Sequence, residues 1–174
     1  IAVEGDAEAT EKVRFVLDGD LLGVTREEGS WGDSQSATVR VTMPAPREIV
    51  IGGSGSAESD TMAEDASIVI GGSGSVRIGE IAAKSFEVVI GGSGSVAASG
   101  TTDRLDMTIG GNGSGQFANL KADDVEISIG GSGSVALQSD GKVEASIGGS
   151  GSINVTGDAK CTLSSFGSGS LNCK

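Results

Sequence analysis

Apolar and polar residues alternate along short stretches of this chain, in a pattern that recurs over most of its length. Residues 105–109 read Leu-Asp-Met-Thr-Ile and residues 125–129 read Val-Glu-Ile-Ser-Ile, so every second side chain is apolar. A period of two is typical of a β-strand that buries one face. Shorter alternations, such as Ile153 and Val155 on either side of Asn154, follow Gly-rich segments. These stretches are therefore predicted to be strands that turn their apolar faces inward.

A Gly-rich hexapeptide separates these predicted strands at intervals of 18 to 20 residues. A period of this length predicts a solenoid, in which each repeat stacks on the one before it. Disordered Gly/Ser linkers have no reason to keep such a spacing. The hexapeptide Ile-Gly-Gly-Ser-Gly-Ser begins at Ile51, Ile70, Ile90, Ile129 and Ile147, a variant with Asn begins at Ile109, and a degenerate copy begins at Ser165.

Superposing the repeats on this segment places apolar residues in columns, so each repeat is predicted to turn once around an apolar axis. The resulting fold is all-β, a single-stranded parallel β-helix of about seven coils spaced about 4.8 Å apart. The strand before each corner supplies one column of Ala66, Phe86, Leu105, Val125, Val143 and Cys161, and a second of Ile49, Ile68, Val88, Met107, Ile127, Ala145 and Leu163.

The corner glycines are predicted to have a conformational and a steric role. Tight bends favour residues that tolerate positive φ, and stacked corners need close approach of successive backbones. Where the repeat length changes, we expect the turn before the next long strand to absorb the difference. The glycines concerned are Gly52, Gly53, Gly55, Gly71, Gly72, Gly74, Gly91, Gly92, Gly94, Gly110, Gly111, Gly113, Gly130, Gly131, Gly133, Gly148, Gly149 and Gly151.

Residues 1–46 lie outside the repeat and are predicted to form a β-strand cap on the β-helix of residues 47–174, within one structural domain. Alternation over residues 12–17 and 37–43, with a turn at residues 18–20, indicates strands there. A solenoid exposes an apolar, unpaired edge at each end unless something covers it. Covering one end of the repeats is therefore the simplest role for this segment.

Composition excludes several classes of function. The chain has 174 residues, a formal net charge of −12, no His, four Phe and one Trp. Without His, the commonest general base and the imidazole metal ligand are missing. The acidic balance argues against nucleic-acid binding, which needs a basic surface, and no apolar run approaches the roughly 20 residues that span a bilayer. Trp31 and Phe166 stand out as aromatic residues in polar segments, and we expect each to cover an open end of the core.

Both cysteines fall in the last coil, where Cys161 and Cys173 continue inward columns of two different strands. We predict that they form a disulfide that locks this terminal coil. Disulfides persist in oxidising compartments, so we expect an exported protein, located in the periplasm, at the outer-membrane surface or outside the cell. The alternative is a pair of buried thiols in a cytosolic protein.

An outward column of acids is the strongest candidate for chemistry. Glu87, Asp106, Glu126 and Glu144 occupy the same position in four consecutive coils. Like charges about 4.8 Å apart repel one another, so the column needs an explanation. A solvated face that discourages sheet association provides one. The functional alternative is a strip for Ca²⁺ or for a polycationic partner; no other cofactor is predicted.

Two weaker patterns lie beside this column. Arg104, Asp124 and Lys142 alternate in sign from coil to coil, which predicts a charge ladder of modest value. Adjacent Asp123 and Asp124 invite comparison with the paired carboxylates of glycoside hydrolysis, but neighbouring residues on a strand point apart. No catalytic residue is therefore assigned, and the chain is predicted not to be an enzyme.

Several of these motifs together resemble the bacterial head GIN domain family of autotransporter-adhesin-like proteins. They are the Gly-Ser-Gly corners, the Val-Thr-Met-Pro stretch of residues 41–44, the final segment from Cys161 to Cys173, and residues 3–6 and 18–21. The resemblance implies a right-handed β-helix, an exported or envelope location, no established catalytic residues and an adhesive role.

We therefore predict a non-catalytic structural or adhesion-type domain that contacts a protein or a glycan at the cell surface or envelope. Association of the chain with further copies of itself, as a homo-oligomer, is a second possible contact. The alternative function is a polysaccharide-binding or pectin-lyase-like carbohydrate-active protein.

Overall fold

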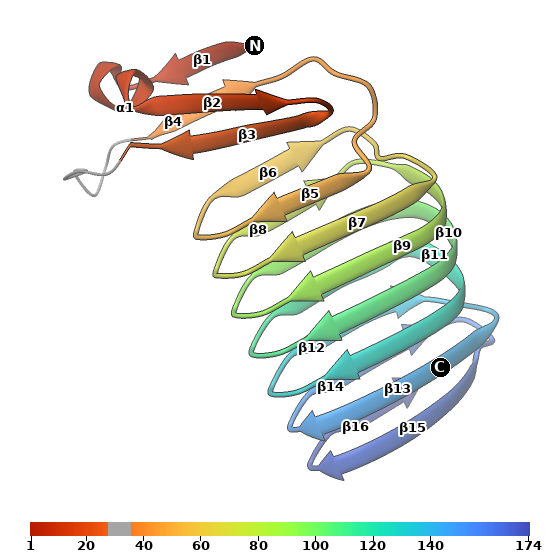
Figure 1. Cartoon of the computed structure of the whole chain (residues 1–174). Helices are drawn as coiled ribbons and strands as arrows, with labels where there is room; N and C mark the ends of the chain where they lie inside the picture. Colours follow the sequence, from red (N-terminus) through yellow and green to blue (C-terminus); the bar gives the residue numbers. More distant parts are fainter. Residues whose placement is uncertain (28–35) are drawn as a thin grey trace. The chain divides into compact units, whose positions relative to one another are not determined.

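A computed structural model gives the fold of this chain and describes residues 1–27 and 36–174 (Figure 1). The chain divides into two compact units, residues 1–44 and residues 45–174. Trp31, which was expected to cover an end of the core, lies outside the described residues.

The first unit consists of antiparallel strands and one short helix. Strands β2 and β3 form a hairpin, and β1 pairs with β4. Gly19 in the hairpin turn has φ +57°, a conformation that favours glycine. The helix was not expected from the alternation of residues 12–17; it precedes that stretch and buries Ala9. The elements are β1 (Ala2–Gly5), α1 (Ala7–Glu11), β2 (Val13–Asp18), β3 (Leu21–Arg26) and β4 (Ala37–Arg40). That this unit caps the repeats stays a prediction.

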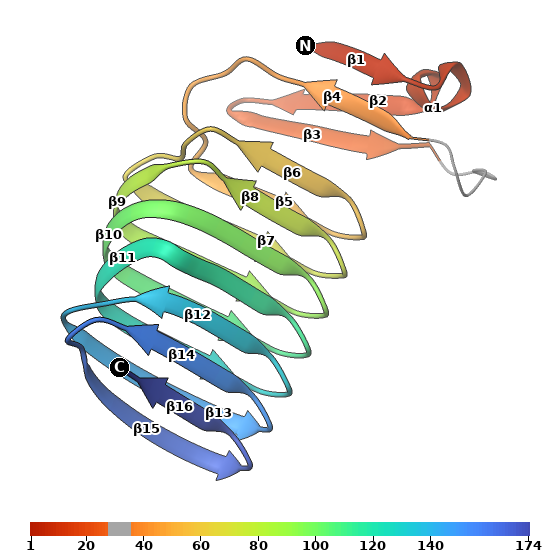
Figure 2. The ribbon, with the colours of Figure 1, turned by 180° about the vertical axis from the view of Figure 1, so that it is seen from behind.

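The second unit is a parallel β-solenoid of stacked coils, which confirms the predicted fold (Figures 1 and 2). Each coil contains a strand before the Gly-rich corner, here called the first strand, and a second strand after it. In the middle coils the second strand continues without interruption into the next first strand, which produces the long strands β10 and β11. The elements are β5 (Glu48–Ile51), β6 (Ser56–Ser59), β7 (Asp65–Ile70), β8 (Ser75–Ile78), β9 (Ile81–Ile90), β10 (Ser95–Ile109), β11 (Ser114–Ile129), β12 (Ser134–Gln138), β13 (Lys142–Gly149), β14 (Ser152–Thr156), β15 (Lys160–Gly167) and β16 (Ser170–Cys173).

The apolar columns predicted from the repeat line the interior of the solenoid. Phe86 pairs in register with Leu105, and Leu105 with Val125, and all three are at most 4% exposed. The two phenylalanines inside the coils, Phe86 and Phe117, meet edge to face with ring centroids 5.9 Å apart, an arrangement that aromatic rings favour. Burial weakens in the last coil, where no further coil follows in the described chain and Leu163 is 38% exposed.

The corner glycines are required by close approach rather than by positive φ. Among the predicted corner glycines, only Gly149 has φ between +20° and +160°, so the expectation of positive φ is wrong for the others. A Cβ on Gly92 would lie 2.4 Å from the carbonyl oxygen of Gly72 in the coil before it, and one on Gly94 would lie 2.7 Å from Cγ2 of Ile70. A Cβ on Gly91, in contrast, would meet its nearest atom at an ordinary 3.8 Å. In each corner that stacks on a preceding one, the second and third glycines therefore have a steric role that the first lacks.

A register irregularity shows where one change of repeat length is absorbed. Ala97 of β10 pairs with Gln116 of β11, and Ser99 pairs with Asn119, so β11 carries one extra residue between them. For this coil, the expectation that the turn before the next first strand absorbs the difference is therefore wrong. The extra residue falls at the end of a second strand, where it forms a β-bulge, and bulges bend a strand and redirect its side chains.

Candidate functional site

The acidic column lies on the outer face of the first strands, as predicted. Glu87, Asp106, Glu126 and Glu144 pair in register from β9 to β13. With Arg104, the first three of these side chains border a shallow hollow of about 330 Å³. The repeat thus places carboxylates in a row. Whether this row can bind a cation depends on how close the basic side chains of the protein lie to it.

Cations on the same face neutralise part of this column. The Arg104 guanidinium donates two hydrogen bonds of 2.8 Å to the Asp106 carboxylate and one of 3.1 Å to that of Glu126. The hydrogen bond to Asp106 is the main reason that the pKa of Arg104 is raised above its ordinary value. Lys142 Nζ lies 2.9 Å from Glu144 Oε2. The expected ladder of Arg104, Asp124 and Lys142 is therefore replaced by ion pairs within strands and across to the neighbouring acid.

Metal binding by this column gains no support from the geometry. Over residues 1–27 and 36–174, no group of three or more His, Cys, Asp or Glu side chains is placed to hold a metal ion. Ca²⁺ takes six to eight oxygen ligands, and the oxygens of Asp106 and Glu126 are engaged by Arg104. A Ca²⁺ strip stays an untested alternative.

The paired aspartates do not converge on a reaction centre. Asp124 lies in register between Arg104 and Lys142 on the outer face of β11. Asp123 precedes it at the bend, and both residues are exposed. Glycoside hydrolysis needs two carboxyl groups that flank one bond, whereas these two belong to adjacent, exposed residues of one strand.

Two ion pairs join neighbouring coils at the bend between second and first strands. Lys84 Nζ lies 2.5 Å from Glu64 Oε2, and Lys121 Nζ lies 2.6 Å from Asp140 Oδ2. Asp140 also accepts a hydrogen bond from the backbone N–H of Asp158. The hydrogen bond from Lys121 is the main cause of the lowered pKa of Asp140. These contacts link successive coils.

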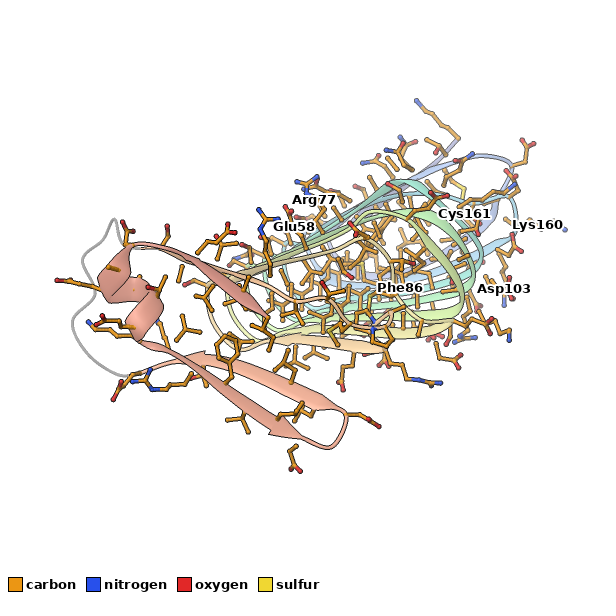
Figure 3. All side chains as sticks on the ribbon, turned by 90° about the horizontal axis from the view of Figure 1, so that it is seen from above. Glu58, Arg77, Phe86, Asp103, Lys160 and Cys161 are labelled. Atoms are coloured by element: carbon orange, nitrogen blue, oxygen red, sulfur yellow. A yellow bond between two sulfur atoms is a disulfide. The ribbon has the colours of Figure 1, made fainter. Side chains whose placement is uncertain are left out.

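The outer face of the second strands carries different side chains. One column there, which we call the second-strand column, contains one acid and one base, Glu58 and Arg77, and is otherwise uncharged. Looking along the coils, Figure 3 shows these two side chains on the outside of the solenoid. They are 3.9 Å apart and highly exposed. The column runs Glu58, Arg77, Ala97, Gln116, Ala136, Asn154 and Asn172.

A second hollow, of about 350 Å³, opens on this face beside the β-bulge. Ala97 is a short side chain between two long ones, Arg77 and Gln116, in the coils before and after it. Ala118 and Asn119, at the bulge, form the adjoining wall. We call this hollow the amide groove; it is lined by Arg77, Gly79, Ala97, Gln116, Ala118 and Asn119.

Neither the alternation nor the repeat predicted this groove. A signal existed, because five of the seven Asn and Gln residues of the chain occupy outward positions of the second strands or their ends. The amide groove itself depends on the register of the strands and on the position of the extra residue in β11. An alignment of the repeats does not show that position. The five amide residues are Gln116, Asn119, Gln138, Asn154 and Asn172.

The last coil contains the disulfide and an exposed aromatic residue. Cys161 and Cys173 form a disulfide between β15 and β16, with Cα atoms 6.5 Å apart. Phe166 pairs in register with Gly148 and is 82% exposed. The expectation that Phe166 covers the open end of the core is therefore wrong, because its corner position points it outward.

Comparison with known proteins supports the fold and identifies the family. Among solved structures, the chain is similar to one from Parabacteroides distasonis ATCC 8503, described as a putative lipid binding protein, with a TM-score of 0.68 and 21% identity over 99% of this chain and 82% of the other. At this identity the likeness concerns the fold. No curated protein matches, and the described part of the chain contains no helix that could span a membrane. Residues 1–159 match the family described as "Putative auto-transporter adhesin, head GIN domain", and the chain therefore belongs to the head GIN domain family.

Proposed function

We propose that this chain is an exported, non-catalytic adhesion domain that presents the faces of a stiff solenoid to partners at the cell surface or envelope. The observation that carries the proposal is the register of the outer columns, which repeat one side-chain position over successive coils. Such a surface suits extended contact with a partner better than chemistry at one point. Membership of an adhesin-like family points in the same direction.

The disulfide supports export. Cys161 and Cys173 are joined in the terminal coil, and disulfides persist in the periplasm and outside the cell rather than in a reducing cytosol. The disulfide also holds β15 and β16 together in the last coil described, which stacks on a neighbour on one side.

The arrangement of the ionisable groups supports a non-catalytic role. The chain contains no His, and the most prominent carboxylates, Asp106 and Glu126, are paired with Arg104 at the surface. General acid–base catalysis needs a group positioned within hydrogen-bond reach of a substrate proton and with a matched pKa. Of the two pairs, Arg104 with Asp106 lies within β10 and Arg104 with Glu126 joins neighbouring coils.

The similar solved structure is described as a lipid binding protein, but the interior of this solenoid does not favour an acyl chain as ligand. Phe86, Phe117 and Met107 fill the middle coils and are at most 2% exposed. A lipid would have to contact the outside of the coils. Liposome flotation of the purified chain separates this from the adhesion proposal.

The proposal is tested in the bacterium that encodes the chain. Protease and antibody access to intact cells should detect the protein at the surface or in the envelope, with its two cysteines oxidised. A strain lacking the gene should adhere less to host cells, to other bacteria or to surface polymers, and the wild-type gene should restore adhesion. A cytosolic location, or unchanged adhesion on all of these substrates, would refute the proposal.

A further inference from the structure

The amide groove has a volume in the range of small-ligand sites. Its volume of about 350 Å³ lies within the range of roughly 300–1,000 Å³ that small-molecule sites occupy. Ala97 and Ala118 contribute short apolar side chains to its lining, which also includes Arg77. The Arg77 guanidinium forms a long ion pair of 3.9 Å with Glu58, and 73% of its side chain is exposed. It is therefore available to donate hydrogen bonds to a ligand.

The β-bulge shapes one wall of the groove. Between the positions of Gln116 and Asn119, β11 has two residues where β10 has only Ala98. The first of the two, Phe117, is fully buried against Phe86, and the second, Ala118, is exposed. The extra residue thus brings Asn119 to the outer face beside Ser99 instead of leaving it inside the coil. Bulges of this kind occur next to binding sites, where they redirect side chains.

Amide side chains are suited to recognise neighbouring hydroxyl groups. An Asn or Gln side chain offers two N–H donors and a carbonyl acceptor in one plane. Gln116 and Asn119 provide two such groups at one groove, and both are exposed. Amides in register can also reach one another along this face, because Asn172 donates a 3.3 Å hydrogen bond to Asn154.

Charge favours an uncharged ligand over an acidic one. The chain has a formal net charge of −12, so its field repels anionic polymers, and the first strands carry a row of acids on the other outer face. The groove is lined by one charged residue, Arg77, and the charge of Arg77 is opposed by Glu58, which lies 3.9 Å from it in the same column. A neutral molecule rich in hydroxyl groups is therefore the ligand that this face binds with the lowest electrostatic penalty.

We propose that the amide groove binds an uncharged glycan. Gln116 and Asn119 hydrogen-bond neighbouring sugar hydroxyls, and the Arg77 guanidinium donates to a further oxygen of the same ring. Ala97 and Ala118 contact the carbon-bound hydrogens of the sugar. This inference rests on the proposed adhesion function, for which it names the class of partner.

The test uses the whole purified chain, a panel of neutral oligosaccharides (glucans, mannans, xylans and galactans) and a matched acidic panel of oligogalacturonates and alginate fragments. Binders found on an array are measured by calorimetry. Gln116→Ala removes an amide from the groove, and Ala97→Leu fills the space between the side chains of Arg77 and Gln116. Two controls make the same kinds of change elsewhere: Asn112→Ala removes an exposed corner amide, and Ser146→Leu adds a leucine to the outer face of the first strands.

A neutral glycan should bind, and each groove variant should weaken binding by about tenfold, the factor expected for the loss of one good contact of about 1.4 kcal/mol. The controls should bind within about twofold of the wild type. All four positions face outward, so unchanged thermal unfolding will show that folding is intact.

Three outcomes overturn the inference: no neutral glycan binds, the groove variants bind as well as the wild type, or only acidic glycans bind. Capture of a protein through the groove with no glycan bound would also refute it. If cells that express the groove variants adhere normally while cells without the gene do not, the groove inference fails and the adhesion function stands. If neither strain is affected, both fail.

Discussion

Replacing the second glycine of a middle corner by alanine tests the steric explanation of the repeat. A Cβ on Gly92 would lie 2.4 Å from the carbonyl oxygen of Gly72, whereas ordinary contact begins at 3.4 Å. The atom in the way is backbone, so it cannot rotate aside. The same carbonyl accepts the 3.0 Å hydrogen bond from the N–H of Ser93. Relief of the overlap therefore separates two stacked coils and weakens a bond between them.

The magnitude follows from these two effects. Overpacking by one methyl group costs about 1–3 kcal/mol, and a weakened backbone hydrogen bond adds about 1 kcal/mol. We expect Gly92→Ala to lower the free energy of unfolding by about 2–4 kcal/mol. For a chain of 174 residues, this corresponds to a fall in Tm of about 5–15 °C.

Two alanine variants serve as matched controls. A Cβ on Gly91 would be 3.8 Å from its nearest atom, and Gly91 lacks a positive φ. Gly91→Ala should therefore raise Tm by about 1–4 °C, because the unfolded chain loses conformational freedom. Gly53 occupies the same corner position as Gly92, but a Cβ there would have no neighbouring atom within 4 Å, so Gly53→Ala should also be tolerated. Calorimetry of the three variants under non-reducing conditions measures these changes. Equal Tm values for Gly92→Ala and Gly91→Ala would refute the steric reasoning.

Three further predictions concern the disulfide, acid stability and calcium. The double variant Cys161→Ser, Cys173→Ser should lose about 2–3 kcal/mol of stability, because it opens a loop closed across a sequence separation of 12. Amide hydrogen exchange should become faster in β16 but not in β10. Equal protection of β16 in the variant and the wild type would contradict this. The lowered pKa of Asp140 means that its stabilising effect is present above its ordinary pKa and is lost as pH falls through the lowered value. Asp140→Asn should therefore flatten the acid limb of a Tm–pH curve, and a limb as steep as that of the wild type would count against the pair with Lys121. Millimolar Ca²⁺ should give no saturable heat in calorimetry, because Arg104 already engages two of the acids; heat that disappears in Glu126→Gln would reverse this expectation.

The solenoid can be predicted from the order of the residues alone. The 18–20-residue period and the alternation of residues such as Phe86 and Leu105 follow directly from the physics of a strand that buries one face of a stacked coil. The same alignment placed Glu87, Asp106 and Glu126 in one outer row and Cys161 and Cys173 in one coil. A repeat carries this information because each position recurs in nearly the same surroundings. One residue thus reports on all its equivalents.

Features that depend on how neighbouring coils fit together could be learned only from the folded chain. Which glycine of a corner is indispensable depends on where a Cβ would point, and only the stacked backbones show that Gly92 meets a carbonyl and Gly91 does not. That Arg104 pairs with Asp106 and Glu126 depends on how far its side chain reaches along β10 and across to β11, which the order of charges in a column does not show. The amide groove depends on one extra residue in β11, and so on a departure from the repeat. Periodicity predicts what recurs, and the groove lies where the period is broken.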